Sequence, residues 1–337
     1  MKPTGLLLLG ALAASSATAQ RPPAHFRKLA HTYSIVAWDS LTGDLGVAVQ
    51  SKFPNVGGLV PWAKAGVGAV ATQSLANTDY GEKGLELLAR GAGAEEALRI
   101  IMRTDTMLGD RQVGIVDARG GAASFTGERT FDWAGGRVGA PGGGSVPGGK
   151  GAVIAGHGFS AQANIMVSDQ TVKNLAEAFE RSRGPLADRL LAALKAGQAG
   201  GGDLRGMQSA ALLVVRKNGG YLGANDRFID IRVYDAKDPI AELERLLALH
   251  KLHFFPSEPQ DLLPITPAIA AQLEPILLAE PANQAEKWLA RPQGSPTPAF
   301  LEALKNFMYW ENYDVRVRMD GKIDRVVLED ILKKRKT

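Results

Sequence analysis

The sequence contains no cysteine, and this absence removes several classes of chemistry at once. Disulfide bonds, thiolate catalysis, cysteine-based zinc sites and lipoprotein anchoring all require that residue. We therefore expect stability to depend on packed apolar cores. An HExxH motif and carboxylate-rich loops are also missing, so the sequence predicts neither a bound metal nor another cofactor.

Long apolar runs and concentrated positive charge are scarce as well. The apolar run at residues 6–14 is shorter than the roughly 20 residues of a membrane-spanning helix, and no later run approaches that length. We therefore expect no stable membrane anchor. The formal net charge is +4, and the basic cluster at residues 333–336 is interpreted as a solvated tail. Without a basic stripe interleaved with aromatic residues, nucleic acid is not an expected partner.

The first residues have the organisation of a secretory signal peptide. Met1-Lys2 precedes the apolar run, and Ala17-Thr18-Ala19 is a small-residue cleavage site. Residues 1–19 are therefore assigned to a signal peptide that is cleaved after Ala19. We expect the mature protein to be periplasmic or secreted.

Beyond this leader, strand and helix patterns alternate. The clearest strand pair is 32–38 and 45–49, where β-branched, aromatic and small apolar residues flank a turn. Glycine and proline crowd residues 135–151, which we expect to be an irregular surface segment without the GxxxxGK[ST] spacing of a phosphate loop. Further strands are expected at 67–73, 112–116, 122–125, 153–157, 210–215 and 228–233, and helices at 81–90, 94–103, 170–181, 185–196 and 239–250.

These patterns predict an α+β fold. Two layers of antiparallel strands with helices on each outer face would bury the apolar strands and leave the helices amphipathic. We therefore predict a four-layer α-β-β-α sandwich over residues 31–254, followed by a proline-rich linker at 255–269. Residues 270–337 are expected to form a small α-helical domain suited to binding. The helical patterns of this tail cover 267–278, 285–289, 298–310 and 324–334.

Several separated motifs carry a family resemblance. Residues 31–73 (HTYSIVAWDSLTGDLGVAVQSKFPNVGGLVPWAKAGVGAVATQ), Asn77 with Tyr80-Gly81, and residues 201–215 resemble the domain of unknown function 1028 (DUF1028) family. The resemblance covers about residues 31–250 and implies the N-terminal-nucleophile (Ntn) hydrolase fold and hydrolysis of an amide bond. Residues 304–332 resemble the peptidoglycan-binding domain that accompanies this family. The implied partners are peptidoglycan or a peptide or amide substrate near the cell wall.

The resemblance implies a role for Thr32. In Ntn hydrolases the first residue of the first strand is a Thr, Ser or Cys whose own α-amine acts as the base. The amine of a terminal Thr32, with a reference pKa of about 7.7 to 8.0, would be partly neutral near pH 7. His31 stands where many relatives have the initiator methionine, so catalysis requires a second cut at the His31–Thr32 bond. An uncut Thr32 would be an ordinary β-branched strand residue.

Other hydroxyl and amine side chains are expected to assist Thr32. Ser51 and Lys52 end the second strand beside the first, where Lys52 would lower the pKa of the nucleophile or stabilise its charge. The alternative is that Lys52 pairs with a surface carboxylate. Ser209 begins a buried strand and is expected to position the terminal amine. Ser34 faces the same side as Thr32 and is a weaker substitute nucleophile.

The residues expected to bind substrate are polar and follow predicted strands. Side-chain amides after the third strand can donate to an oxyanion, although local turn bonds are an equal alternative. His157 stands between two glycines that would let a ligand approach closely, with a structural role as the alternative. Asp203 belongs to a polar cluster that is either part of the site or an ion-pair network. The full set is Gln73, Ser74, Asn77, His157 and Asp203.

Functions from two other classes stay open. The same sandwich can serve a non-catalytic envelope protein that binds a small ligand or muropeptide, and its outer helices can assemble homo-oligomers. An uncut His31–Thr32 bond in the mature protein would favour the binding protein. Phe53, Leu59 and Trp62 either line a pocket or fill the core.

Overall fold

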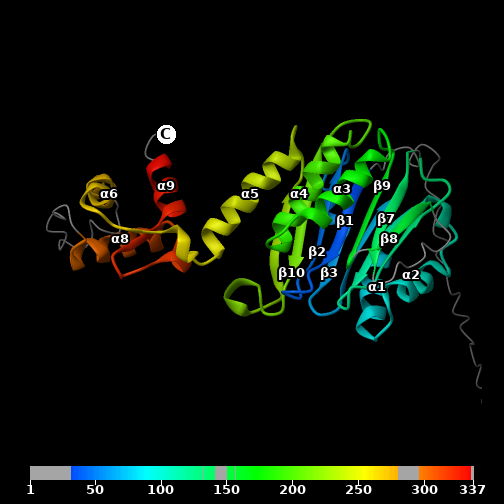
Figure 1. Ribbon diagram of the computed structural model, residues 1–337, viewed down its shortest axis with the longest axis horizontal. Helices are drawn as coiled ribbons and strands as arrows, with labels where there is room; N and C mark the ends of the chain where they lie inside the picture. The colour runs from blue at the N-terminus through cyan, green and yellow to red at the C-terminus, as the bar shows by residue number, and fades with distance from the viewer. Residues whose placement is uncertain (1–31, 132, 141–149, 156, 280–295, 335–337) are drawn as a thin grey trace, which may run out of the picture.

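The structure, a computed structural model, describes residues 32–131, 133–140, 150–155, 157–279 and 296–334. It is a mixed α+β structure in which antiparallel sheets are covered by helices (Figure 1). The expected signal peptide, the cleavage position after Ala19, His31 and the helix expected at 285–289 lie outside the described residues. Within the described ranges, no helix combines the length and the apolar character needed to cross a membrane.

A seven-stranded sheet is built around β1 (Thr32–Trp38). β1 pairs antiparallel with β2 (Leu45–Ser51) on one side and with β9 (Phe159–Asn164) on the other. The strand order is β11-β10-β2-β1-β9-β7-β8, in which β7 and β8 pair in parallel and the other neighbours pair antiparallel. The outer strands are β7 (Gly135–Ala140), β8 (Gly151–Ala155), β10 (Ser209–Val215) and β11 (Arg227–Val233).

A four-stranded antiparallel sheet stacks on one face of this larger sheet. The two sheets share an apolar core that includes Val36, Val47 and Val49 from one and Ala69 and Ala71 from the other. Alternate strand residues point to the same face, so every second side chain of β1 and β2 faces the four-stranded sheet. The strands, in order, are β3 (Pro61–Lys64), β4 (Gly68–Ser74), β5 (Arg111–Asp117) and β6 (Ala122–Thr126).

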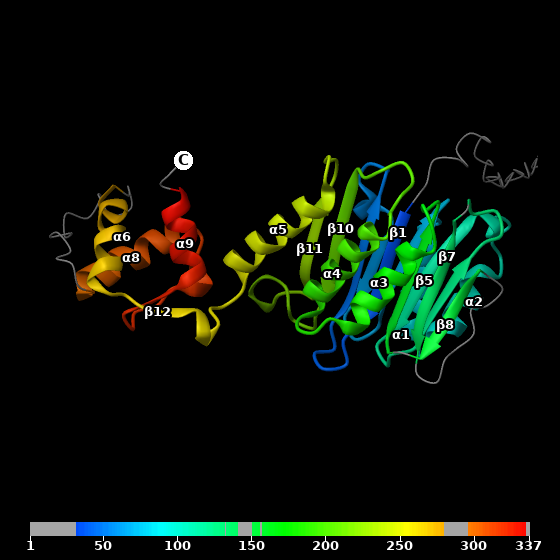
Figure 2. The ribbon, with the colours of Figure 1, turned by 45° about the horizontal axis from the view of Figure 1, so that its top comes forward.

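Helices cover the outer face of each sheet. α1 (Asp79–Ala89) and α2 (Ala94–Met102) pack on the four-stranded sheet. α3 (Gln170–Arg181) and α4 (Leu186–Ala199) pack on the seven-stranded sheet, as Figure 2 shows. Full burial of each large aliphatic or aromatic side chain in these helices contributes about 1.5–3 kcal/mol to folding. The helices therefore bury the outer face of each sheet.

The C-terminal unit has its own apolar core at the far end of α5 (Pro239–Phe254) (Figure 1). This unit contains α6 (Pro267–Ala279), α8 (Pro298–Trp310) and α9 (Arg325–Lys334). It also contains a two-stranded sheet of β12 (Leu262–Pro264) and β13 (Lys322–Asp324). Short 3-10 turns occur at Val56–Gly58, Leu108–Asp110, Tyr221–Gly223, Pro259–Asp261 and Asp314–Arg316.

The structure corrects the expectation for the glycine-rich segment. Residues 135–140 form β7, so the prediction of irregular structure over 135–151 is wrong at its start. Pairing of β7 with both β8 and β9 overrides the low strand propensity of glycine. The C-terminal unit, expected to be all helical, also holds the β12–β13 sheet, and β12 lies within the segment expected to be a linker.

Candidate functional site

Thr32, the first residue of β1, lines a cavity of about 200 Å³ at one end of the stacked sheets. Ser51, at the end of β2, and Gln73 and Ser74, at the end of β4, line the same cavity. Thr32 and Ser51 are register partners, so their side chains point to the same face of the sheet. The structure therefore brings these four predicted site residues together.

The candidate nucleophile is held from three neighbouring strands. The Oγ1 of Thr32 lies 3.1 Å from the Oγ of Ser51, within hydrogen-bond distance. The Nε2 of Gln73 donates to the carbonyl of Thr32 at 3.1 Å, and the Nδ2 of Asn164 donates to the same carbonyl at 3.4 Å. These contacts fix the start of β1 in one position beside the cavity.

Buried amide side chains form a network between the sheets next to Thr32. Gln73 donates through Nε2 to the Oε1 of Gln112 at 2.7 Å, and Gln112 donates to the hydroxyl of Thr126 at 2.8 Å. The hydroxyl of Ser34 donates to Gln73 and accepts from Gln162, both at 2.6 Å. Such mutually bonded buried groups rigidify one another. Ser34 is engaged in this network and is not among the residues that line the cavity.

One acceptor beside Thr32 has no hydrogen-bond partner among the described residues. Asn164 is the register partner of Thr32 on β9, and its Nδ2 donates to the Oε1 of Gln112 at 2.8 Å. The Oδ1 of Asn164 is buried and makes no hydrogen bond within the described residues. An unsatisfied buried acceptor costs about 1–3 kcal/mol. An additional donor close to Thr32 would remove that cost.

The backbone of Ser74 adopts a left-handed conformation, with a φ of 66°. This conformation is uncommon for a residue other than glycine and costs of order 1–3 kcal/mol. It ends β4 and starts the turn in which Leu75 and Ala76 form a wall of the cavity. Local strain of this kind clusters at functional sites.

The other walls of the cavity are apolar. Phe53 and Leu59 contribute to them, which decides between the two alternatives for these side chains. Trp62 does not line the cavity; its Nε1 donates to the carbonyl of Leu59 at 2.9 Å and its ring packs against the core under α1. The apolar lining residues are Phe53, Val56, Leu59, Val60, Leu75 and Ala76.

Ser209 supports the cavity without lining it. Its hydroxyl donates to the carbonyl of Phe53 and accepts from the backbone N–H of Val56 at 3.1 Å. Ser209 therefore holds the segment that supplies two of the apolar wall residues.

Lys52 directly follows the last residue of β2, and Asp203 contacts its backbone. The Nζ of Lys52 donates to the carbonyl of Met207 at 3.2 Å. The backbone N–H of Lys52 donates to the carboxylate of Asp203 at 3.1 Å, and Asp203 also pairs with Arg205 at 3.1 Å. Neither Lys52 nor Asp203 is among the residues that line the cavity. Their contacts anchor the strand end that carries Ser51.

The structure does not bring His157 to the cavity. His157 is exposed and precedes Gly158, whose carbonyl accepts a hydrogen bond from the backbone N–H of Trp38. Trp38 and Thr32 are the two ends of β1. At about 3.3 Å per strand residue, His157 lies roughly 20 Å from Thr32.

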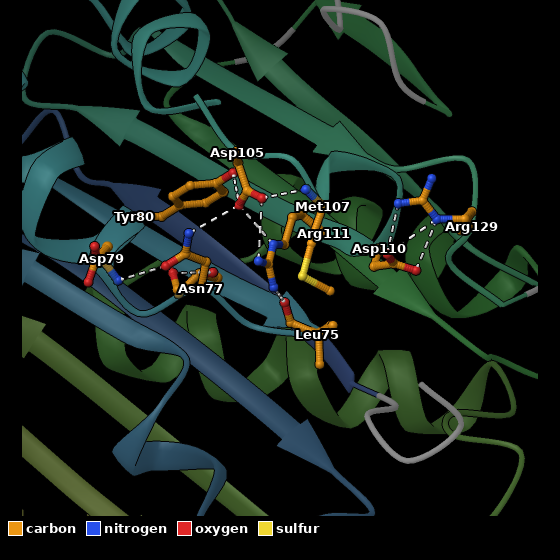
Figure 3. Close-up of polar contacts among 10 residues, drawn as sticks. Leu75, Asn77, Asp79, Tyr80, Asp105, Met107, Asp110, Arg111 and Arg129 are labelled. Carbon is orange, nitrogen blue, oxygen red and sulfur yellow. Dashed lines mark hydrogen bonds and ion pairs between the residues drawn. The ribbon is translucent and has the colours of Figure 1, made fainter. Parts of the chain in front are cut away.

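Asn77 belongs to a second polar cluster, centred on Asp105 (Figure 3). Asn77, Tyr80 and Arg111 donate to this carboxylate at 3.1, 2.7 and 2.9 Å. Burial alone would raise the pKa of Asp105, but the hydrogen bonds from Arg111 and Tyr80 lower the pKa to about 2. Arg111 also donates to the carbonyl of Leu75, so the cluster fixes one wall of the cavity.

Sequence reasoning missed Gln112, Gln162 and Asn164. Each stands at a fully buried position of a strand, where an apolar side chain is the ordinary choice. A buried amide at such a position was the available indication of an internal polar network. In the part of the chain that the structure describes, no group of three or more His, Asp or Glu residues is placed to hold a metal ion.

Comparison with known families covers the unit that contains the cavity. A model of DUF1028, described as a family of unknown function, matches residues 32–142 and 140–243, more than half of the chain. The chain belongs to the DUF1028 family. The family match begins at Thr32, the residue that opens β1.

A solved structure supports the assignment of this DUF1028 chain. The crystal structure of a protein from Silicibacter pomeroyi, assigned to the same family, is similar with a TM-score of 0.56 and 28% sequence identity. The similarity covers 66% of this chain and 86% of that protein. No curated protein matches this chain significantly.

Proposed function

We propose that this protein is an exported amidohydrolase or peptidase of the Ntn type, with Thr32 as its nucleophile. The observation that carries this proposal is the placement of the Thr32 hydroxyl, at the start of β1, on a cavity and 3.1 Å from the hydroxyl of Ser51. The order of helices, sheet, sheet and helices supports the four-layer α-β-β-α sandwich of that class. The family match that starts at Thr32 agrees with this role.

The proposed hydrolysis requires that the backbone nitrogen of Thr32 become a free α-amine. Cleavage of the His31–Thr32 bond would convert the amide nitrogen of Thr32 into an α-amine. In its neutral form, partly present near pH 7, this amine would take the proton from Oγ1 as the oxygen attacks the substrate's amide carbon. The C–N bond then breaks, the leaving amine receives that proton, and an ester on Thr32 remains. Water attacks the ester with the same amine as base and releases the acid.

Two neighbouring side chains suit this reaction. Ser51 is within hydrogen-bond distance of the attacking oxygen and would orient it. The unpaired Oδ1 of Asn164 would accept a hydrogen bond from the newly formed amine. Ser51 and Asn164 both contact Thr32 before any cleavage, which would preorganise the site.

The test is intact mass and N-terminal sequencing of protein recovered from an exporting host. We expect a terminus at Thr32 in the wild type and in Thr32→Ser, and a terminus at Gln20 in Thr32→Ala. Thr42→Ala, which removes an exposed hydroxyl at the other end of the β1–β2 hairpin, should process normally. A terminus at Gln20 in every variant would contradict the proposal and favour the non-catalytic envelope protein that binds a ligand with this fold.

We further propose that the C-terminal unit binds peptidoglycan. Tyr309 and Trp310, at the end of α8, are 50% and 60% exposed, so two adjacent aromatic side chains are available to stack on a ligand. Co-sedimentation with purified sacculi should weaken in Trp310→Ala. It should stay unchanged in Tyr234→Ala, which removes a 63% exposed aromatic side chain just after β11, in the unit that contains the cavity.

Homo-oligomer formation through the outer helices is the third proposal, and light scattering tests it.

A further inference from the structure

The described walls of the cavity at Thr32 are made of uncharged side chains. Its polar side chains are hydroxyls and one amide, and none of the described residues that line it carries a charged side chain. A carboxylate or ammonium group placed against the apolar walls, away from the amine of a processed Thr32, would lose its hydration without gaining an ion pair from a side chain, which is strongly unfavourable. Apolar groups gain free energy there because six aliphatic or aromatic residues replace water around them.

The size of the cavity limits what it accepts. Its volume of about 200 Å³ is below the roughly 300–1,000 Å³ of pockets for drug-sized ligands. At about 30 Å³ for each water-sized group, it encloses on the order of seven non-hydrogen atoms, and the rest of a longer ligand would extend into solvent. That is the size of a short acyl chain rather than of a muropeptide.

The walls are fixed before a ligand enters. Ser209 holds the backbone of Phe53 and Val56, Trp62 donates to the carbonyl of Leu59, and Arg111 donates to the carbonyl of Leu75. A preformed pocket loses little conformational freedom on binding and therefore discriminates by shape and charge.

We infer that this cavity binds the acyl side of the substrate and selects an uncharged aliphatic acyl group of about four to six carbons. The inference rests on the proposed function, because it places the scissile carbonyl at Thr32. It narrows the substrate class to amides of short apolar acids and disfavours amides whose acyl group ends in a carboxylate.

The first experiment compares acyl p-nitroanilides hydrolysed by the processed protein. We expect kcat/KM to rise roughly four-fold for each methylene from acetyl to hexanoyl and to stop rising at decanoyl. Glutaryl p-nitroanilide should be at least about 100-fold poorer than the hexanoyl compound. Equal or faster hydrolysis of the glutaryl compound would overturn the inference and leave the Thr32 nucleophile in place.

A substitution at the cavity mouth reverses the selection. Leu59 is 38% exposed, so Leu59→Arg adds a cation to the wall with little disturbance of the core. The hexanoyl-to-glutaryl ratio of kcat/KM should fall at least about ten-fold. Leu249→Arg, at a leucine with 42% exposure on α5, is the matched control and should leave the ratio unchanged. An unchanged ratio in Leu59→Arg would contradict the inference.

Binding to Thr32→Ala, cut at the 31–32 bond by an added protease so that it begins where the processed protein begins, separates this inference from the catalytic proposal. Ligand-detected NMR should show binding of hexanamide, none of glutaramate, and loss of hexanamide binding when Leu59→Arg is added. This pattern without hydrolysis of any anilide by the wild type would reject the nucleophile and retain the pocket's selectivity. Binding of glutaramate, or no binding of hexanamide, would reject the selectivity itself.

Discussion

Two hollows adjoin the segment 73–79, and they differ in what their polar groups do. The larger, about 430 Å³, is lined by three acidic and three basic side chains, whereas the described residues that line the cavity at Thr32 include no charged side chain. In the larger hollow each charge has a partner of opposite sign. The pairs are Asp79–Lys83, Glu86–Arg90 and Asp105–Arg111.

The difference teaches that neither charge nor size identifies the site. The charged hollow is electrostatically satisfied, and its buried pair serves to hold the chain at Leu75 and Asn77. The smaller cavity combines the hydroxyl of Thr32, a strained residue at Ser74 and, beside it, an acceptor on Asn164 that has no hydrogen bond among the described residues. Perturbed, strained and unsatisfied groups concentrate at functional sites. One hollow therefore positions the wall of the other.

The largest effect that would sharpen this comparison is on stability. Asp105→Ala leaves Arg111, which is 11% exposed, without its carboxylate, and should lower the free energy of unfolding by about 3–5 kcal/mol. Asp79→Ala breaks the exposed pair with Lys83 and should change the free energy of unfolding far less. Urea unfolding at pH 7 measures both. Equal effects would show that the Asp105 cluster is no more structural than a surface ion pair.

A smaller effect is expected on the stability of the folded protein at acidic pH. The hydrogen bonds that lower the pKa of Asp105 to about 2 stabilise the folded protein above the unfolded pKa of about 3.9, and this stability is lost as the pH falls toward 2. The contribution is about 2 kcal/mol. Urea unfolding between pH 5 and pH 2 should therefore show a steeper loss in the wild type than in Asp105→Asn. Parallel curves would contradict the assigned role of this carboxylate.

The elements predicted from the sequence are those with a clear period. The strand at 32–38 and the helices at 170–181 and 298–310 are confirmed at their residues, because apolar side chains recur at strand or helix spacing there. β9 was not predicted, since Ser160, Gln162 and Asn164 alternate where a buried strand normally has apolar residues. The side chain of Asn164, for example, finds its amide partner on β5 only when the four-stranded sheet lies opposite β9.

The candidate site divides in the same way. Thr32 and Ser51 were predictable as neighbours because a hairpin with a tight turn fixes its own register. Asn77 comes only three residues after Ser74 in the chain and was expected to share its site. The chain turns at Ser74 through a left-handed conformation, and the side chain of Asn77 instead donates to Asp105. The partnership of Gln73, Gln112 and Asn164 depends on three strands that are distant in sequence, and no local pattern encodes it.

The smallest expected effect is a shift in the pH dependence of kcat/KM when the Oδ1 acceptor of Asn164 is changed. Asn164→Asp would place a carboxylate next to the amine of a processed Thr32, stabilise its protonated form and raise its pKa. The acid limb of the kcat/KM profile should move up by about one pH unit, equivalent to about 1.4 kcal/mol. Asn174→Asp makes the same change on α3, which covers the opposite face of the sheet, and should leave the profile in place. Because a purely structural role for Asn164 would lower the rate without moving the limb, an unmoved limb would show that the acceptor does not face the amine.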